Sequence, residues 1–206
     1  MEKDQTQSKD MQDRMENIAR VQEQLEAEGY QMKDETFPAL TANLMIFATG
    51  VPISILLGAV YLLVQRKNAL NVFTCNWKLV LLALLISVPV HEFLHGLGFV
   101  RTCRGKWKSI GFGFQLKSLM PYCFCKEALS IGAYLFGALL PCTVLGLIPS
   151  VIAIAANLPA VFLFGILNIL IASGDLTIVL RLLRYIGKDV RIFDHPVKCG
   201  SIVFLK

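Results

Sequence analysis

WKLVLLALLISVPVHEFLHGLGFV, residues 77–100, is the stretch of sequence that decides the fold class. A helix needs ~20 mostly apolar residues to cross the hydrocarbon core of a bilayer, and this stretch is long enough. Lys78 and Glu92 are its only charged residues. A helix of a water-soluble protein would carry charges along a solvent-facing side, and this stretch has no such side. The stretch therefore predicts a transmembrane helix.

Three further stretches meet the same test, so we predict an all-α integral membrane protein with four transmembrane helices. The chain is 55% hydrophobic and 17% charged, which is unusual for a soluble domain. The first apolar stretch is too long for a cleavable signal peptide, and we interpret it as a signal anchor. The four predicted spans are residues 40–64, 77–100, 131–156 and 160–180.

Basic residues are distributed unequally between the two sides that these spans define. The N-terminus, the loop 101–129 and the tail from residue 181 share one side, which holds 17 of the 20 Lys and Arg residues. The positive-inside rule places that side in the cytoplasm. We therefore expect a multi-pass protein of the cell membrane with both termini in the cytoplasm.

The six cysteines are interpreted from the same orientation. Four of them fall on the predicted cytoplasmic side, where thiols stay reduced, so no disulfide is expected. A second metal site that includes Cys123 and Cys125 is a weaker interpretation, because the CxC spacing is not specific.

The first 38 residues form a polar segment that we separate from a membrane domain of residues 39–206. Apolar residues recur in this segment at helical spacing, which predicts an amphipathic helix. Its role stays open between a solvated helix, a short coiled coil and a helix on the membrane surface. The apolar positions are Met11, Met15, Ile18, Val21 and Leu25.

A small β-hairpin is predicted between the second and third spans. Apolar and other residues alternate over 110–117, which is a strand pattern, and residues 120–125 follow a predicted turn at 117–119. An extended substrate could pair with the edge of the first strand. Phe112 and Phe114 are therefore candidate substrate-binding residues, while an apolar loop lying on the membrane is the alternative.

The segment His91-Glu-Phe-Leu-His95 carries the chemistry of the chain. Residues four apart lie on one face of an α-helix, so two imidazoles can hold one metal ion. Glu92, next to the first histidine, can reach a water molecule at that metal and act as a general base. A polar cluster without metal is the alternative, but an unpartnered carboxylate at membrane depth costs ~2.5 to 3.5 kcal/mol.

A catalytic zinc needs a third protein ligand, and Asp175 is the best candidate. It is the only acidic residue of the fourth span. His95 and Asp175 each lie six residues, or ~9 Å, before the basic residue at which their span leaves the membrane, Arg101 or Arg181. One aspartate and one glutamate also neutralise a divalent zinc ion. His195 in the tail is a weaker candidate. Asn168, seven residues before Asp175, is a candidate for binding the substrate backbone, although interhelical packing is the commoner role of such an asparagine.

The chain resembles the site-2 protease class of membrane zincins, and more closely a family of small bacterial membrane proteins described as putative zincin peptidases. The resemblance covers residues 40–206 and implies a zinc ion bound by His91, His95 and Asp175, with Glu92 as general base. One departure is that site-2 proteases usually present their aspartate in an Asn/Pro-rich LDG segment, whereas this chain has SGDL. The motifs that carry the resemblance are HEFLHGLGF at 91–99, PYCFCKE at 121–127, LP at 140–141, GLIP at 146–149, SGDL at 173–176 and DHP at 194–196.

The sequence therefore predicts an intramembrane zinc metalloprotease that hydrolyses peptide bonds of membrane-associated substrates. The expected partners are a membrane protein or peptide substrate and the lipid bilayer, with no nucleic acid, and the oligomeric state stays open. A membrane metal-binding or transport protein with the same ligands is the main alternative, in which Glu92 would be replaceable. An aspartyl intramembrane protease would need two membrane aspartates, and the predicted spans contain one.

Overall fold

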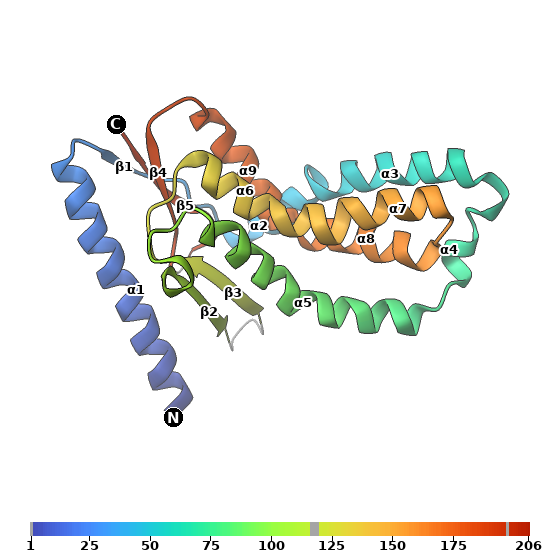
Figure 1. Cartoon of the computed structure of the whole chain (residues 1–206), viewed down its shortest axis with the longest axis horizontal. Coiled ribbons are helices and arrows are strands. Elements are labelled where there is room, and N and C mark those ends of the chain that lie inside the picture. The colour runs from blue at the N-terminus through green and yellow to red at the C-terminus, as the bar shows by residue number, and fades with distance from the viewer. Residues whose placement is uncertain (1, 116–119, 197) are drawn as a thin grey trace.

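The computed structural model describes residues 2–115, 120–196 and 198–206, and it is mostly helical. Four helices, α3, α5, α7 and α8, lie side by side as an elongated bundle at one end of the molecule (Figure 1). The strands and helix α1 gather at the other end. The helices are α1 (Glu2–Ala27), α2 (Ala39–Leu44), α3 (Gly50–Gln65), α4 (Asn71–Thr74), α5 (Trp77–Val100), α6 (Ile131–Pro141), α7 (Ile148–Ala156), α8 (Pro159–Ile171) and α9 (Ser173–Leu182).

Among the described residues, three helical segments are long and apolar enough to cross a membrane, namely Met45–Gln65, Trp77–Val100 and Ile131–Ala156. The number rises to four if α8 and α9 together count as one span. Large apolar side chains cover the outside of this bundle, which suits contact with lipid better than contact with water. Examples on α3 and α5 are Leu56, Leu63, Leu81 and Leu85.

The fourth predicted span is broken. A continuous helix was expected over 160–180, but α8 ends at Ile171 and α9 begins at Ser173, with a bend of 51°. Ala172 and Gly174 are small, and Ser173 can bond its own backbone, so the chain is free to turn at this step. The break changes the direction in which the residues after it are presented.

The third span contains an irregular turn. A π-helical segment, η4 (Cys142–Leu147), separates α6 from α7 directly after Pro141. Proline lacks the backbone N–H of a regular helix, which accounts for the altered hydrogen bonding here. Gly146 in this turn allows a close approach to Ile169 of α8, because a Cβ at position 146 would lie 2.6 Å from the Ile169 side chain.

The predicted hairpin is confirmed. Strands β2 (Ile110–Gln115) and β3 (Met120–Cys125) pair antiparallel, with Phe112 opposite Cys123 and Phe114 opposite Pro121. The predicted turn at 117–119 lies outside the described residues. Between α5 and β2, the 3-10 turn η3 (Lys106–Ser109) leads the chain into the hairpin.

A second sheet was not predicted from the sequence. Strand β5 (Ser201–Leu205) lies between β1 (Gln31–Asp34) and β4 (Val190–Asp194), and both pairings are antiparallel. The sheet therefore joins the segment before the first span to the C-terminal tail. The domain boundary at residue 38 stays a prediction. Strand β1 lies before this boundary, and its partner β5 lies after it.

Helix α1 packs on this sheet. Its residues Ile18, Val21 and Leu25 contact a cluster that includes Phe193 and Phe204 of the sheet. Three of the five apolar positions of α1 thus meet the sheet of the same chain, a contact that the amphipathic pattern alone does not specify.

Candidate metal centre

Helix α5 presents His91 and His95 toward the interior of the bundle, where they are 7% and 8% exposed. The helix packs very closely on α6 one turn later. A Cβ at Gly98 would lie only 2.5 Å from the Cα of Gly137, so this contact requires glycine. The same Gly137 carbonyl oxygen lies 3.0 Å from His95 Nδ1.

Asp175 reaches the two histidines from the first turn of α9, just after the helix break. Its Oδ2 lies 3.1 Å from His91 Nε2 and 3.5 Å from His95 Nε2. The two Nε2 atoms are 3.2 Å apart. The structure therefore brings together the three residues that the sequence analysis proposed as metal ligands, and they form the one such cluster among the described residues.

These distances fit a zinc ion. Ligand atoms at 2.0–2.2 Å around a tetrahedral zinc lie about 3.3–3.6 Å from one another. The three observed separations, 3.1, 3.2 and 3.5 Å, are close to that range. Two imidazoles and one carboxylate are also ligands that zinc takes, with the fourth position left for water or substrate.

The hydrogen bonding of His95 supports the same interpretation. A carbonyl oxygen only accepts, so Nδ1 of His95 must donate to Gly137, which leaves Nε2 of the neutral ring with a lone pair. That lone pair faces Nε2 of His91 and Oδ2 of Asp175. Three such atoms pointing at one another require protons or a cation between them, and a backbone acceptor behind the ring is typical of zinc-binding histidines.

Glu92 lies at the edge of a cavity of about 220 Å³ that also contains His95 and Asp175. Pro121, Tyr122 and Cys123 of β3 line the same cavity, so the hairpin forms one of its walls. The Glu92 carboxylate therefore lies near the three candidate metal ligands but is not one of them.

The comparison with protein families agrees with this geometry. Residues 84–188 match the model of the family described as "Putative zincin peptidase", which covers both histidines, Glu92 and Asp175. The chain belongs to this family. Neither the curated proteins nor the solved structures contained a match.

The zincin peptidase match supports a metallopeptidase with zinc as cofactor. The other predicted site residues lie around the centre rather than in it. Phe112 and Phe114 are exposed on β2, and Phe112 lies against Gly96, next to His95. The backbone N–H of Lys198 donates to Nδ1 of His195, which is not part of the metal cluster.

Asn168 is 1% exposed within α8. Its Nδ2 donates to the carbonyl oxygen of Phe164 at 2.9 Å, while its Oδ1 has no hydrogen-bond partner among the described residues. It does not occur among the described residues that line the 220 Å³ cavity. The roles proposed for Asn168, Phe112 and Phe114 in binding substrate stay predictions.

The residues that line the cavity include a hydrogen-bonded pair, Tyr134 and Asp194, which was given no role from the sequence. Tyr134 of α6 donates a hydrogen bond from its hydroxyl to Asp194 at the end of β4, at 2.5 Å. Burial raises the pKa of the Asp194 carboxyl above its ordinary value, while the hydrogen bond from Tyr134 lowers it. The DHP motif at 194–196 was the only signal in the sequence, and it offered no indication of which residue Asp194 would meet.

The thiols near the site are structural in character. Burial raises the pKa values of Cys103, Cys123 and Cys125 above that of an ordinary thiol. Because the thiolate is the nucleophilic form, burial disfavours these three side chains as nucleophiles at neutral pH, and the metal-ligand cluster found among the described residues does not include them. The sulfurs of Cys103 and Cys125 lie 2.9 Å apart, and all six cysteines are free.

Proposed function

We propose that this protein is an intramembrane zinc metalloprotease that cleaves peptide bonds of membrane-associated substrates. His91, His95 and Asp175 hold the zinc ion, and Glu92 acts as general base. Phe112 and Phe114 of the hairpin, together with Asn168, contact the substrate. The observation that carries the proposal is the set of three ligand atoms 3.1 to 3.5 Å apart, beside a carboxylate that is not one of them.

Glu92 transfers the proton during peptide hydrolysis, and His95 is held in the orientation that metal binding needs. When bound, zinc lowers the pKa of water toward ~7 and polarises the scissile carbonyl group. The Glu92 carboxylate accepts a proton from the attacking water and delivers it to the leaving nitrogen. The hydrogen bond from His95 Nδ1 to the carbonyl oxygen of Gly137 orients the ring of His95.

The location inside a membrane is supported by where the ligands lie on the helices. His91 and His95 belong to α5, which is one of the three helices able to cross a membrane. Both lie in its C-terminal half, and the excess of basic residues after α5 and α9 supports a cytoplasmic location of that end. A transmembrane substrate must be unwound locally before its backbone can be attacked, and the edge of β2 offers an extended partner for it.

The decisive experiment measures zinc content and hydrolysis together. The full-length protein is purified with zinc, and wild type, Glu92→Gln and His91→Ala are compared for zinc stoichiometry and for cleavage of a co-expressed single-span reporter protein. We expect Glu92→Gln to retain zinc and to lose activity by ~100-fold or more, because the amide keeps the shape but is not a base. His91→Ala should lose both zinc and activity, since it removes a ligand.

The outcomes separate the protease from a metal-binding protein. If Glu92→Gln cleaves the reporter as well as wild type does, Glu92 is not the general base and the hydrolytic mechanism fails. If wild type and His91→Ala contain the same amount of zinc, the three-ligand centre is wrong.

A further inference from the structure

A third carboxylate, that of Asp194, lines the cavity of the metal centre and has no part in the proposed hydrolysis. It shares the 220 Å³ cavity with Glu92, His95 and Asp175. Glu92 and Asp175 already balance the two charges of a zinc ion. The other described residues that line this cavity include no Lys or Arg, and the positive charge that reaches Asp194 is that of Arg14, from the adjoining cavity.

Asp194 is held in place by packed aromatic rings. Tyr134, whose hydroxyl donates to Asp194, is 3% exposed, and its ring lies 5.7 Å from that of Phe99. The Phe99 ring in turn stacks on the ring of His95 at 6.1 Å. The contacts from Asp194 through Tyr134 and Phe99 to His95 fix the Asp194 carboxylate relative to the metal centre. A group bound by Asp194 would therefore take a defined position beside the metal centre.

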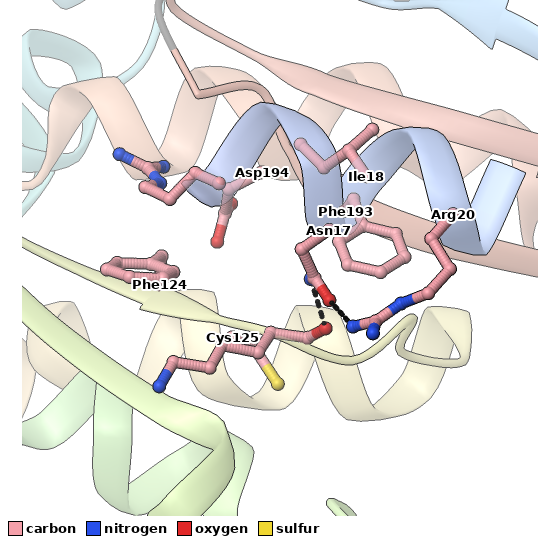
Figure 2. Close-up of a pocket in the computed structure, with 9 residues that line it drawn as sticks. Asn17, Ile18, Arg20, Phe124, Cys125, Phe193 and Asp194 are labelled. Atoms are coloured by element: carbon pink, nitrogen blue, oxygen red, sulfur yellow. Dashed lines mark hydrogen bonds between the residues drawn. The ribbon is translucent and has the colours of Figure 1, made fainter. Parts of the chain in front are cut away.

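The aromatic wall beside Asp194 already holds a cation of the same chain. The guanidinium carbon of Arg14, in α1, lies 4.2 Å from the ring centre of Phe124 and 5.1 Å from that of Tyr122. Arg14, Phe124 and Asp194 line a second cavity of about 290 Å³. Figure 2 shows Phe124 and Asp194 facing the space between α1 and β3. Aromatic faces next to a carboxylate are the chemistry that recognises Lys and Arg side chains.

An aromatic ring and a carboxylate of this kind also lie at the metal centre, because Tyr122 and Asp194 both line the 220 Å³ cavity. We propose that Asp194, together with Tyr122 and Tyr134, forms a subsite that takes a Lys or Arg side chain of the substrate next to the scissile bond. The inference rests on the proposed proteolytic function. It also fits the substrates expected there, since Lys and Arg are enriched where transmembrane segments reach the cytoplasm.

The test uses the full-length protein in membranes and a set of reporter proteins with one transmembrane segment. The cytoplasmic flank of each reporter is neutral except for a single Lys, Gln or Glu, which is moved one position at a time. We expect one position at which wild type cleaves the Lys reporter at least about tenfold faster than the Gln reporter. In Asp194→Asn this ratio should fall to about one, and in Asp194→Lys the Glu reporter should become the better substrate.

Two further variants separate positioning from folding. Tyr134→Phe removes the hydroxyl that positions Asp194, and it should lower the Lys-to-Gln ratio mainly through a higher KM for the Lys reporter. Asp189→Asn is the matched control, because Asp189 is an exposed aspartate at the start of the same strand and lines neither cavity. It should keep the wild-type ratio.

The results distinguish a failure of the proposed subsite from a failure of the proposed proteolytic function. Equal cleavage of the Lys, Gln and Glu reporters by wild type at every position, or an unchanged ratio in Asp194→Asn, would overturn the subsite and leave the protease standing. Wild-type cleavage no greater than that of Glu92→Gln for every reporter would overturn the proposed function and the subsite together. A reversed preference in Asp194→Lys cannot arise from misfolding, so it supports the subsite directly.

Discussion

Replacing Gly98 by alanine should weaken zinc binding although it alters no ligand. A Cβ at Gly98 would lie 2.5 Å from the Cα of Gly137, and non-bonded carbon atoms sit about 3.5–4.0 Å apart. Helices α5 and α6 must therefore separate by about 1 Å at this level. Gly137 also accepts the 3.0 Å hydrogen bond from His95 Nδ1, and a separation of about 1 Å would stretch it beyond hydrogen-bonding distance.

The expected loss can be estimated from the role of this hydrogen bond. Removing the partner that orients a metal-binding histidine typically lowers metal affinity by about 10- to 100-fold, which is about 1.4 to 2.7 kcal/mol. The assay is competition for zinc between the purified full-length protein in detergent and a chelator of known affinity. Gly132→Ala is the matched control in α6, because a Cβ at Gly132 meets nothing within 4 Å. It should bind zinc as wild type does.

One result would refute this reasoning. If Gly98→Ala has the helical content of wild type by circular dichroism and also binds zinc with wild-type affinity, the Gly137 carbonyl does not orient His95. The close contact between α5 and α6 would then be a packing feature unrelated to the metal centre.

Three further predictions test the topology and the fold. Thiol labelling of intact cells should find Cys75 accessible from outside and Cys199 protected until the membrane is opened. Oxidation of membranes at alkaline pH, which offsets the raised pKa values of the two buried thiols, should link Cys103 to Cys125, whose sulfurs are 2.9 Å apart, as detected by loss of maleimide labelling in the denatured protein. Glu127→Ala should lower the free energy of unfolding in detergent by about 1 to 2 kcal/mol at neutral pH, because Glu127 accepts hydrogen bonds from the loop after α5.

The effect at Glu127 should also depend on pH. Burial alone would raise the pKa of its carboxyl, but hydrogen bonds from Ser109 and from the backbone of Gly105 and Arg104 lower it below the ordinary value. A lowered pKa contributes stability above the unfolded pKa, and this contribution is lost as the pH falls through the folded pKa. The difference between wild type and Glu127→Ala should therefore shrink in acid.

Each of the three predictions has an outcome that contradicts it. Labelling of Cys199 rather than Cys75 in intact cells would reverse the orientation. A link that forms equally well in Cys125→Ser would show that Cys103 pairs elsewhere. A difference at Glu127→Ala that is constant down to strongly acid pH would mean that the charge of Glu127 does not contribute.

Local patterns predicted the parts of the structure that depend on local chemistry. The apolar stretch of α5 and the alternation in β2 each reflect one face or one side of a single element, so their spacing alone identifies them. The pair His91 and His95 is predictable for the same reason, because four residues along a helix return to the same face. Asp175 was found by a different argument, its equal depth in another helix, and the structure places it beside both histidines.

Contacts between distant segments were not predictable from such patterns. The sheet pairs β1 near the N-terminus with β5 at the C-terminus, and neither strand has an alternation that specifies its partner. The same is true of Tyr134 and Asp194, which are brought together by the packing of α6 against β4. Nothing in the local sequence of either residue specifies the other.

The break between α8 and α9 explains how Asp175 reaches the metal centre. It places Asp175 in the first turn of a new helix, where unpaired backbone N–H groups and the helix dipole stabilise a carboxylate. An isolated carboxylate at membrane depth is costly, and the helix start together with the two imidazoles reduces that cost. The position of Asp175 thus follows from the break rather than from a helix face. For the same reason, the seven-residue spacing that linked Asn168 to Asp175 does not carry across the 51° bend, and Asn168 must be tested by itself.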